Sequence, residues 1–158
     1  MGGAEVSFSS RLLRQAVRDR VAALVLPSGL PEGWTALRDS KEVYPHWRRV
    51  LRSPVHLEFC IGAASSAPEP MRQRTGVGGM TREEMVVGVS VQLRPGADAE
   101  VDGDALLDLE RAIRDWLLIS WSPSVRTLWS SSERTPGPEG WLYSEIRLVC
   151  LWTDSLSS

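Results

Sequence analysis

The chain has little of the material on which most enzyme chemistry depends. Lys41 is the only lysine among 18 basic residues, and it stands in Asp-Ser-Lys-Glu-Val. That context fits neither a phosphate-binding loop, nor a pyridoxal Schiff base, nor a kinase lysine. Histidine and cysteine occur twice each, and none of the motifs GxSxG, HExxH, CxxC or GxGxxG is present. We therefore expect no enzyme activity, no cofactor and no metal site.

Long apolar runs and a strong charge of either sign are also missing. No run approaches the roughly 18 residues that cross a bilayer, and the first residues lack the basic and apolar regions of a signal peptide. A net charge of -2 argues against a protein that coats nucleic acid. Cys60 and Cys150 are too few for a disulfide framework. We expect a cytoplasmic protein with free thiols and no membrane contact.

Size and composition are those of one folded unit. The chain has 158 residues, of which 42% are hydrophobic and 24% charged. A chain of this length buries roughly 70% of its unfolded surface. Neither an internal repeat nor a linker divides it. We predict a single domain over 1–158, with loose ends at 1–9 and 153–158.

Two segments have the apolar periodicity of amphipathic helices. Residues 10–25 place leucine and valine at three- and four-residue steps, with arginines on the other face. Residues 102–119 show the same pattern, and Asp102 or Asp104 is predicted to cap this helix. Pro27 to Gly29 ends the first segment, and Ser122-Pro123 follows the second.

Other segments alternate as strands do. The clearest lie at 55–61, 84–93 and 141–152, with shorter candidates at 35–38 and 125–129. Residues 44–53 are either a short helix or irregular, residues 62–80 are predicted to be a mobile, hairpin-like loop, and residues 130–140 a polar turn. The order of elements predicts an α+β fold: a mostly antiparallel sheet with both main helices on one face and a long hairpin-like loop.

Two candidate sites for catalysis or metal binding have little support in the sequence. His56 and Cys60 share a strand face, but positions four apart on a strand are about 13 Å apart. Residues 98–103 resemble the first half of a calcium loop, through Asp98, Glu100 and Asp102. The twelfth position, which should be glutamate, is Leu109, so an acidic helix start is the plainer interpretation.

Residues that suit a protein interface are more plentiful. Several of the seven tryptophans lie at the ends of predicted elements, and tryptophan and arginine dominate interface hot spots. A tryptophan-rich core is the equally open alternative. The glycine-rich part of the 62–80 loop carries arginines that can order against a neighbouring subunit. The candidate interface residues are Arg72, Arg74, Thr75, Gly76, Trp34, Trp129 and Trp141.

The sequence resembles small neck and tail proteins of tailed phages. The resemblance runs from Ser10 to Trp152. Its features are the N-terminal helix Ser-Ser-Arg-Leu-Leu-Arg-Gln-Ala-Val-Arg-Asp-Arg-Val, the strand at 55–61, the loop with Arg72, Arg74 and Thr75, and the strand at 85–93. The helix Asp-Ala-Leu-Leu-Asp-Leu-Glu-Arg-Ala-Ile-Arg-Asp-Trp-Leu and the final strand Ser-Glu-Ile-Arg-Leu-Val-Cys-Leu-Trp complete it. Together they look like a tail terminator, also called a tail completion protein.

This resemblance implies a structural virion protein. A tail terminator forms a ring, usually a hexamer, that caps the tail tube, stops its growth and joins it to the head-side connector. The implied partners are further copies of the chain, the tail tube protein and the connector, with DNA only passing through the channel. Assembly in the host cytoplasm and residence in the virion neck follow. A head-tail connector or adaptor is the near alternative. A small ligand-binding or hydrolytic domain that uses His56, Glu58 and the glycine loop is the distant one.

Overall fold

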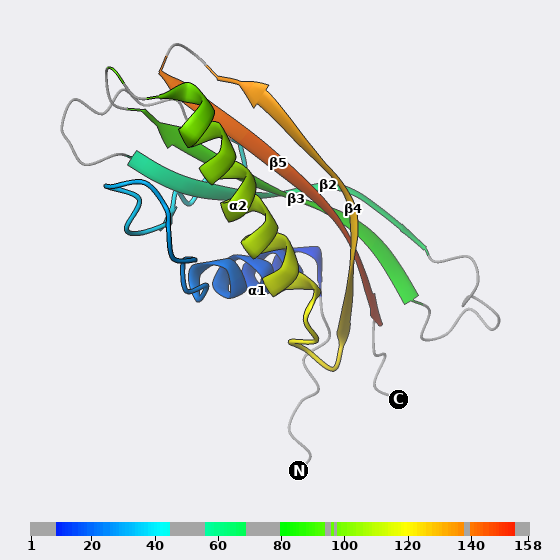
Figure 1. Ribbon diagram of the computed structural model, residues 1–158. Coiled ribbons are helices and arrows are strands. Elements are labelled where there is room, and N and C mark those ends of the chain that lie inside the picture. Colours follow the sequence, from blue (N-terminus) through cyan, green and yellow to red (C-terminus); the bar gives the residue numbers. More distant parts are fainter. Residues whose placement is uncertain are drawn as a thin grey trace.

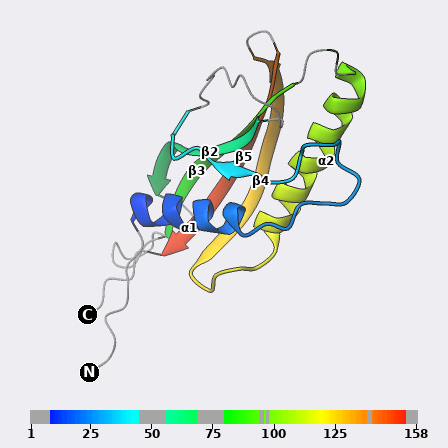
Figure 2. The same ribbon diagram turned by 90° about the vertical axis from the view of Figure 1, so that its left-hand side faces the viewer.

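The computed structural model describes residues 9–44, 56–68, 80–93, 96, 98–137 and 140–153. Five strands form one sheet in the order β1-β2-β3-β5-β4, in which only the β1–β2 pair is parallel. Both helices cover the same face of this sheet (Figures 1 and 2). The predicted α+β class is therefore confirmed. In chain order the elements are α1 (Ser10–Ala22), β1 (Arg38–Asp39), β2 (His56–Pro68), β3 (Met80–Gln92), α2 (Ala99–Leu118), β4 (Val125–Pro136) and β5 (Trp141–Thr153).

The core lies between the sheet and the two helices. The apolar positions of β2, β3 and β5 alternate as the sequence predicts, and every second side chain faces the helices. The helices contribute the apolar stripes that their periodicity predicts. The largest fully buried side chains are Phe59, Leu13, Leu57, Ile61, Met85, Leu109, Ile113, Leu117, Ile146 and Leu148.

The C-terminal end of α1 and the start of α2 differ from the prediction. The backbone N–H of Leu12 donates to Ser9 Oγ, which caps α1, but this helix ends at Ala22 and leaves Val25 exposed. The side chain of Asp98 caps α2 by accepting from the backbone N–H groups of Glu100 and Val101, at 3.0 and 3.3 Å. The prediction that Asp102 or Asp104 caps this helix is wrong, because α2 begins at Ala99.

Three strands are longer than the sequence predicts, since β3 also begins at Met80 and not at Glu84. Residues 62–68 belong to β2 and residues 130–136 to β4, so the loop predicted over 62–80 and the turn predicted over 130–140 are wrong for these parts. These stretches are rich in alanine, serine and threonine, and their ladder partners in β3 and β5 determine their conformation. The rest of the predicted loop, 69–79, and most of the segment predicted as helix or irregular, 45–53, lie outside the described residues.

Glycine is required at position 88 of β3, because the Tyr143 ring packs directly over this residue. A Cβ at this position would stand 2.7 Å from the Tyr143 hydroxyl oxygen and 2.8 Å from Cys60 Sγ. We expect Gly88→Ala to lower the free energy of unfolding by about 2 kcal/mol, because both side chains are buried and cannot yield freely. Gly103→Ala, within α2 and with no atom near its Cβ, should instead raise it by about 0.5–1 kcal/mol. Chemical denaturation measures both values, and equal effects would contradict this explanation.

Candidate functional site

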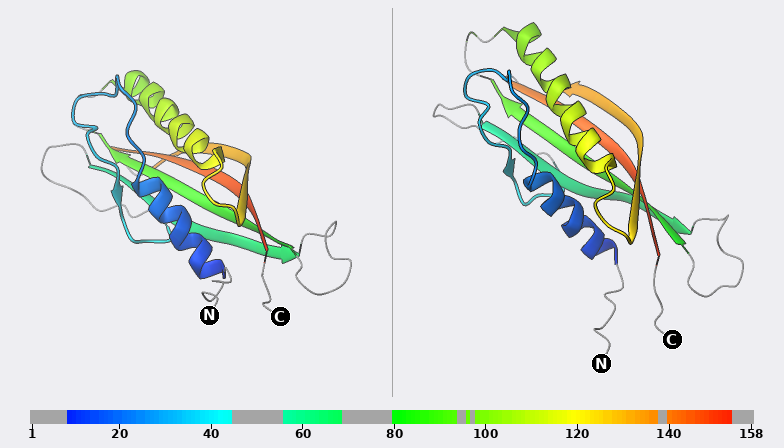
Figure 3. Two further views of the ribbon diagram at one scale, coloured as in Figure 1. Left: turned by 90° about the horizontal axis from the view of Figure 1, so that it is seen from below. Right: turned by 60° about the horizontal axis from the view of Figure 1, so that its bottom comes forward.

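Strand β4 forms one edge of the sheet. Among the described residues, β5 is its only ladder partner, so its outer side is open. Figure 3 shows β4 running along the border of the sheet beside α2. Four apolar side chains near this border are between 38% and 56% exposed. We call them the β4 edge surface: Leu118, Ile119, Leu128 and Trp129.

A groove of about 610 Å³ runs along this surface. Its walls come from the end of α2, the turn into β4 and the first residues of β4. The indole N–H of Trp121 donates to the carbonyl oxygen of Leu117 at 3.1 Å, which holds the turn against the helix. Trp129 does not line the groove; the apolar lining residues are Met80, Leu118, Ile119, Trp121, Pro123, Val125, Leu128 and Leu151, and the polar ones are Ser120, Ser122, Ser124, Arg126 and Thr127. The groove therefore has a mixed lining, in which Leu118, Ile119 and Leu128 are the exposed large apolar side chains.

Trp129 is fixed in place although it is exposed. The Arg114 guanidinium of α2 lies 4.4 Å from the centre of its ring, and its indole N–H donates to Ser132 Oγ at 3.0 Å. The ladder with β5 shifts between Trp129 and Ser131, which is a β-bulge. Bulges bend an edge strand and redirect its side chains. A rigid, half-exposed tryptophan next to an arginine has the character of an interface hot spot.

A buried carboxylate holds β4 against α2. Arg134 donates to both oxygens of Glu110, at 2.9 and 2.6 Å, and Ser144 Oγ–H donates to the same carboxylate. Glu110 is buried in the middle of α2, whereas Arg134 and Ser144 face each other across β4 and β5. The planar, two-point contact of Arg134 fixes the position of the edge strand as well as stabilising it.

The opposite edge of the sheet is formed by β2, and β1 covers only part of it. β1 pairs with β2 at two positions, Glu58 and Phe59, and the last contact of this kind is Ser40 N–H to the Phe59 carbonyl oxygen at 3.0 Å. Lys41 then adopts a φ of +63°, in the left-handed region. The chain therefore leaves the strand direction directly after β1.

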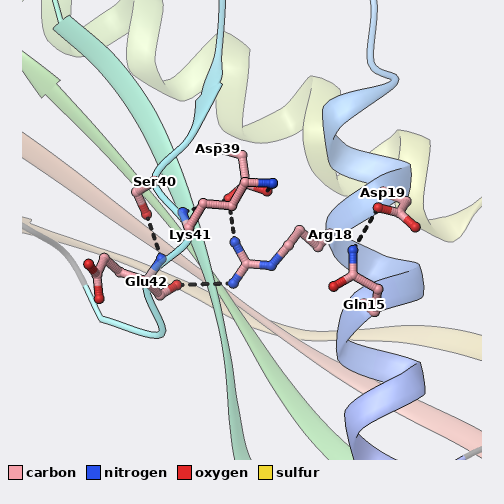
Figure 4. Close-up of polar contacts among 7 residues, drawn as sticks. All are labelled: Gln15, Arg18, Asp19, Asp39, Ser40, Lys41 and Glu42. Carbon is pink, nitrogen blue, oxygen red and sulfur yellow. Dashed lines mark hydrogen bonds and ion pairs between the residues drawn. The ribbon is translucent and has the colours of Figure 1, made fainter.

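An ion pair fixes this departure (Figure 4). Arg18 of α1 pairs with the carboxylate of Asp39 and also donates to the carbonyl oxygen of Glu42, at 3.1 Å. The same Asp39 carboxylate accepts from the backbone N–H of Lys41 at 2.8 Å. Arg18 and Asp39 are both largely buried, so their pairing ties α1, β1 and the turn together.

Gly62 marks the end of this covered stretch. The carbonyl oxygen of Val43 lies 2.9 Å from where a Cβ at Gly62 would stand, an approach that only glycine permits. Beyond Gly62, residues 63–68 of β2 pair with β3 alone among the described residues. Within the part of the chain that the structure describes, the sheet thus has two open edges, and they differ from each other in sequence.

The predicted interface residues have different surroundings. Trp129 lies in the β4 edge surface. Trp34 is 4% exposed and belongs to the core, which is the alternative that the sequence left open for the tryptophans. Trp141 is 5% exposed and offers a partner little surface. The loop residues Arg72, Arg74, Thr75 and Gly76 lie outside the described residues.

The other members of the β4 edge surface could not be identified from the sequence. Leu118 and Ile119 end a helix whose other leucines are core residues, so their periodicity gave no signal of exposure. Leu128 alternates with Trp129 along β4 and lies on the opposite face of the strand. The alternation was visible in the sequence, but an edge position for the strand was not.

The face of the sheet opposite the helices carries the other potentially reactive groups. Burial raises the pKa of the Cys60 thiol to about 11, and burial raises the pKa of Tyr143 beside it. A thiol with such a pKa is a poor nucleophile at neutral pH. Arg147 pairs there with Glu84 at 3.0 Å and with Glu145 at 2.6 Å. These contacts form a charge ladder that stabilises the sheet.

The two buried thiols make the stability depend on alkaline pH. Burial raises the pKa of Cys60 from 9.0 to about 11 and that of Cys150 to about 12. Above pH 9 the unfolded chain releases protons that the folded chain keeps, so the free energy of unfolding falls by roughly 1 kcal/mol per pH unit for each thiol. We expect denaturation between pH 9 and 11 to show this fall, and a shallower one when both cysteines are replaced by alanine. Identical slopes would contradict the assignment.

The acidic start of α2 is part of a helix cap. One side-chain oxygen of Asp98 accepts hydrogen bonds from two backbone N–H groups. Burial raises the pKa of Asp102. Within the part of the chain that the structure describes, no three histidine, cysteine, aspartate or glutamate residues are grouped so as to hold a metal ion. The acidic residues fit the positive end of the α2 dipole.

Two observations concern the chain as a whole. Neither described helix combines the length and the apolar character needed to cross a bilayer. Comparison of the sequence with protein-family models and with curated proteins found no match.

Proposed function

We propose that this chain is the ring-forming tail terminator of a tailed phage, which caps the tail tube and joins it to the head-side connector. The observation that carries the ring is the pair of unlike open edges. A surface that is not complementary to itself binds a different surface of the next copy, and such head-to-tail contacts close into a ring when the rotation between copies allows it. The β4 edge surface supplies one half of this contact.

The resemblance described above supports the phage assignment. It runs from Ser10 to Trp152 and rests on both helices and on β2, β3 and β5. On this proposal the ring is a hexamer, its other partners are the tail tube protein and the connector, and DNA passes through its channel. The finished ring would present no free edge in its own plane. The mechanism is geometric, and termination follows because the outer face of the ring offers no site for another layer of tube subunits.

A growth assay tests this function. Purified chain is added to tail tube subunits while light scattering follows their polymerisation. A terminator limits tube length at substoichiometric amounts, because it acts only at tube ends. Unchanged tube length at a molar excess would overturn the proposal.

A binding comparison separates the terminator from a connector or adaptor. A terminator is retained by tube protein, whereas an adaptor is retained by the portal-side protein of the head and not by the tube. A ligand-binding or hydrolytic domain would bind neither.

A further inference from the structure

We propose that β4 of one copy pairs, antiparallel, with residues 63–68 of β2 in the next copy, so that one continuous sheet runs around the ring. The occupant of the β4 edge is therefore a second copy of this chain. This inference rests on the proposed function for the closure of the ring. It adds to that function the two segments that join and their relative direction.

Strand direction is the first support. β2 is antiparallel to β3, β3 to β5 and β5 to β4, so β2 and β4 run in opposite directions. Rotation about a ring axis keeps the direction of each strand relative to that axis. β4 of one copy would thus meet β2 of the next in antiparallel orientation, which continues the pattern within the subunit. Antiparallel pairing needs no connecting segment and forms well at sheet edges.

The height of the two segments within the sheet is the second support. Pro68 is level with Thr81 of β3, which is level with Trp152 of β5, which is level with Val125 of β4. By the same ladders, Ala63 is level with Trp129. The stretches 63–68 and 125–130 therefore have the same length and lie at the same height on opposite edges.

Matching bulges are the third support. The register of β2 shifts between Ala63 and Ser65, and that of β4 shifts between Trp129 and Ser131. Each edge thus has one extra residue, and the two extra residues lie at neighbouring levels. A bulge bends a strand and increases its twist, so the two edges bend at nearly the same height. Strands that bend together can pair along their length, whereas a straight strand would separate from a bent one.

Side-chain size is the fourth support. Trp129 and Leu128 are large and about half exposed. The residues at the same levels in β2 are Ala63 and Ser65, which are small in sequence. Pairing would therefore bring Trp129 and Leu128 to the levels of two β2 positions that the sequence fills with an alanine and a serine. In contrast, pairing of two β4 strands about the bulge at Ser130 would place Arg126 opposite Arg134, and like charges opposite each other destabilise a ladder.

Disulfide trapping tests this pairing. A chain with both Leu128→Cys and Ser65→Cys is assembled, oxidised mildly, treated with alkylating reagent and analysed on a non-reducing gel. Directly opposite residues in an antiparallel pair have the spacing of a disulfide. We expect a ladder from dimer up to the ring number. Each single variant is the matched control and should remain monomeric on the gel. The native thiols Cys60 and Cys150 are buried and are blocked before denaturation.

Other results of the trapping experiment separate alternative arrangements of the strands. A second pair, Arg126→Cys with Ser65→Cys, detects pairing staggered by two residues, as the tilt of strands in a closed sheet can require, and its ladder would also support the inference. Dimers from Leu128→Cys alone would overturn it, since two β4 strands would then meet.

Wild-type amide hydrogen exchange is independent of the variants, and assembly should slow it at least about tenfold in 63–68 and 125–130. Rings without this slowing would overturn the pairing and leave the proposed function standing, whereas tubes that are never capped would overturn the function itself.

Discussion

Replacing Leu128 with arginine should prevent ring assembly without unfolding the subunit. Leu128 is 41% exposed on the edge strand, so its replacement removes no core contact. In the assembled ring it would be covered by the neighbouring β2, and an arginine there would be buried without a partner. An unpaired charge in an interface costs several kcal/mol, and about 3 kcal/mol corresponds to a more than 100-fold loss of affinity. Sedimentation velocity measures the loss, and circular dichroism checks the fold.

Val25→Arg is the matched control for this substitution. Val25 is 87% exposed, just after α1, and takes no part in either edge. The same change of side chain and charge should leave assembly unaltered there. If both variants assemble like the wild type, the β4 edge surface is not a subunit contact. If both fail, net charge rather than position is responsible.

Replacing Glu110 with alanine should destabilise the subunit by about 3 kcal/mol, because hydrogen bonds to charged groups contribute about 1.5–3 kcal/mol each. Three such bonds end on this carboxylate, two from Arg134 and one from Ser144. Ser144 is fully buried, so its hydroxyl would lose its partner without gaining water. Arg134 is half exposed and recovers part of its loss in solvent.

Asp108→Ala controls for the loss of an acid from α2. Asp108 is exposed on the same helix, two residues before Glu110. Its replacement should change the free energy of unfolding by less than about 0.5 kcal/mol. Urea denaturation of both variants gives the comparison. Equal, small effects would show that the Glu110 contacts add little to the attachment of β4 to α2.

The helices and the inner face of the sheet were predictable because burial imposes a period on them. Phe59, Met85 and Leu148 recur in alternating patterns that match the pleat of a strand. The stripe of α2 follows the helical repeat in the same way. Where one face of a helix or strand is buried, its apolar residues repeat with the period of that element. The α+β class follows from the order of helical and strand repeats along the chain.

The edge strands were predictable only in part. The far halves of β2 and β4 contain alanine, serine and threonine, and the side chains of β4 there are mostly exposed. Such residues show no alternation, so the ladder with a neighbouring strand is the only reason for their conformation. The start of α2 lies three residues before the predicted one, because Asp98 competes with Asp102 and Asp104 as the cap.

The candidate site was the least predictable feature. Composition predicted that tryptophan and arginine would matter, and Trp129 with Arg114 fits that expectation. Composition cannot say which tryptophan is used in the core, and Trp34 is one that is. The exposure of Leu118 and Ile119 follows from the position of β4 at the border of the sheet, which depends on strand order. Strand order is a property of the whole fold.

Imaging of capped tubes tests the central claim most directly. Tail tubes polymerised with the purified chain are examined by electron microscopy, and the two ends of each tube are averaged separately. The proposed function predicts a single ring of rotational symmetry at one end of each tube and none at the other. Bare ends on all tubes, or the chain present only as a two-fold dimer along their sides, would contradict it.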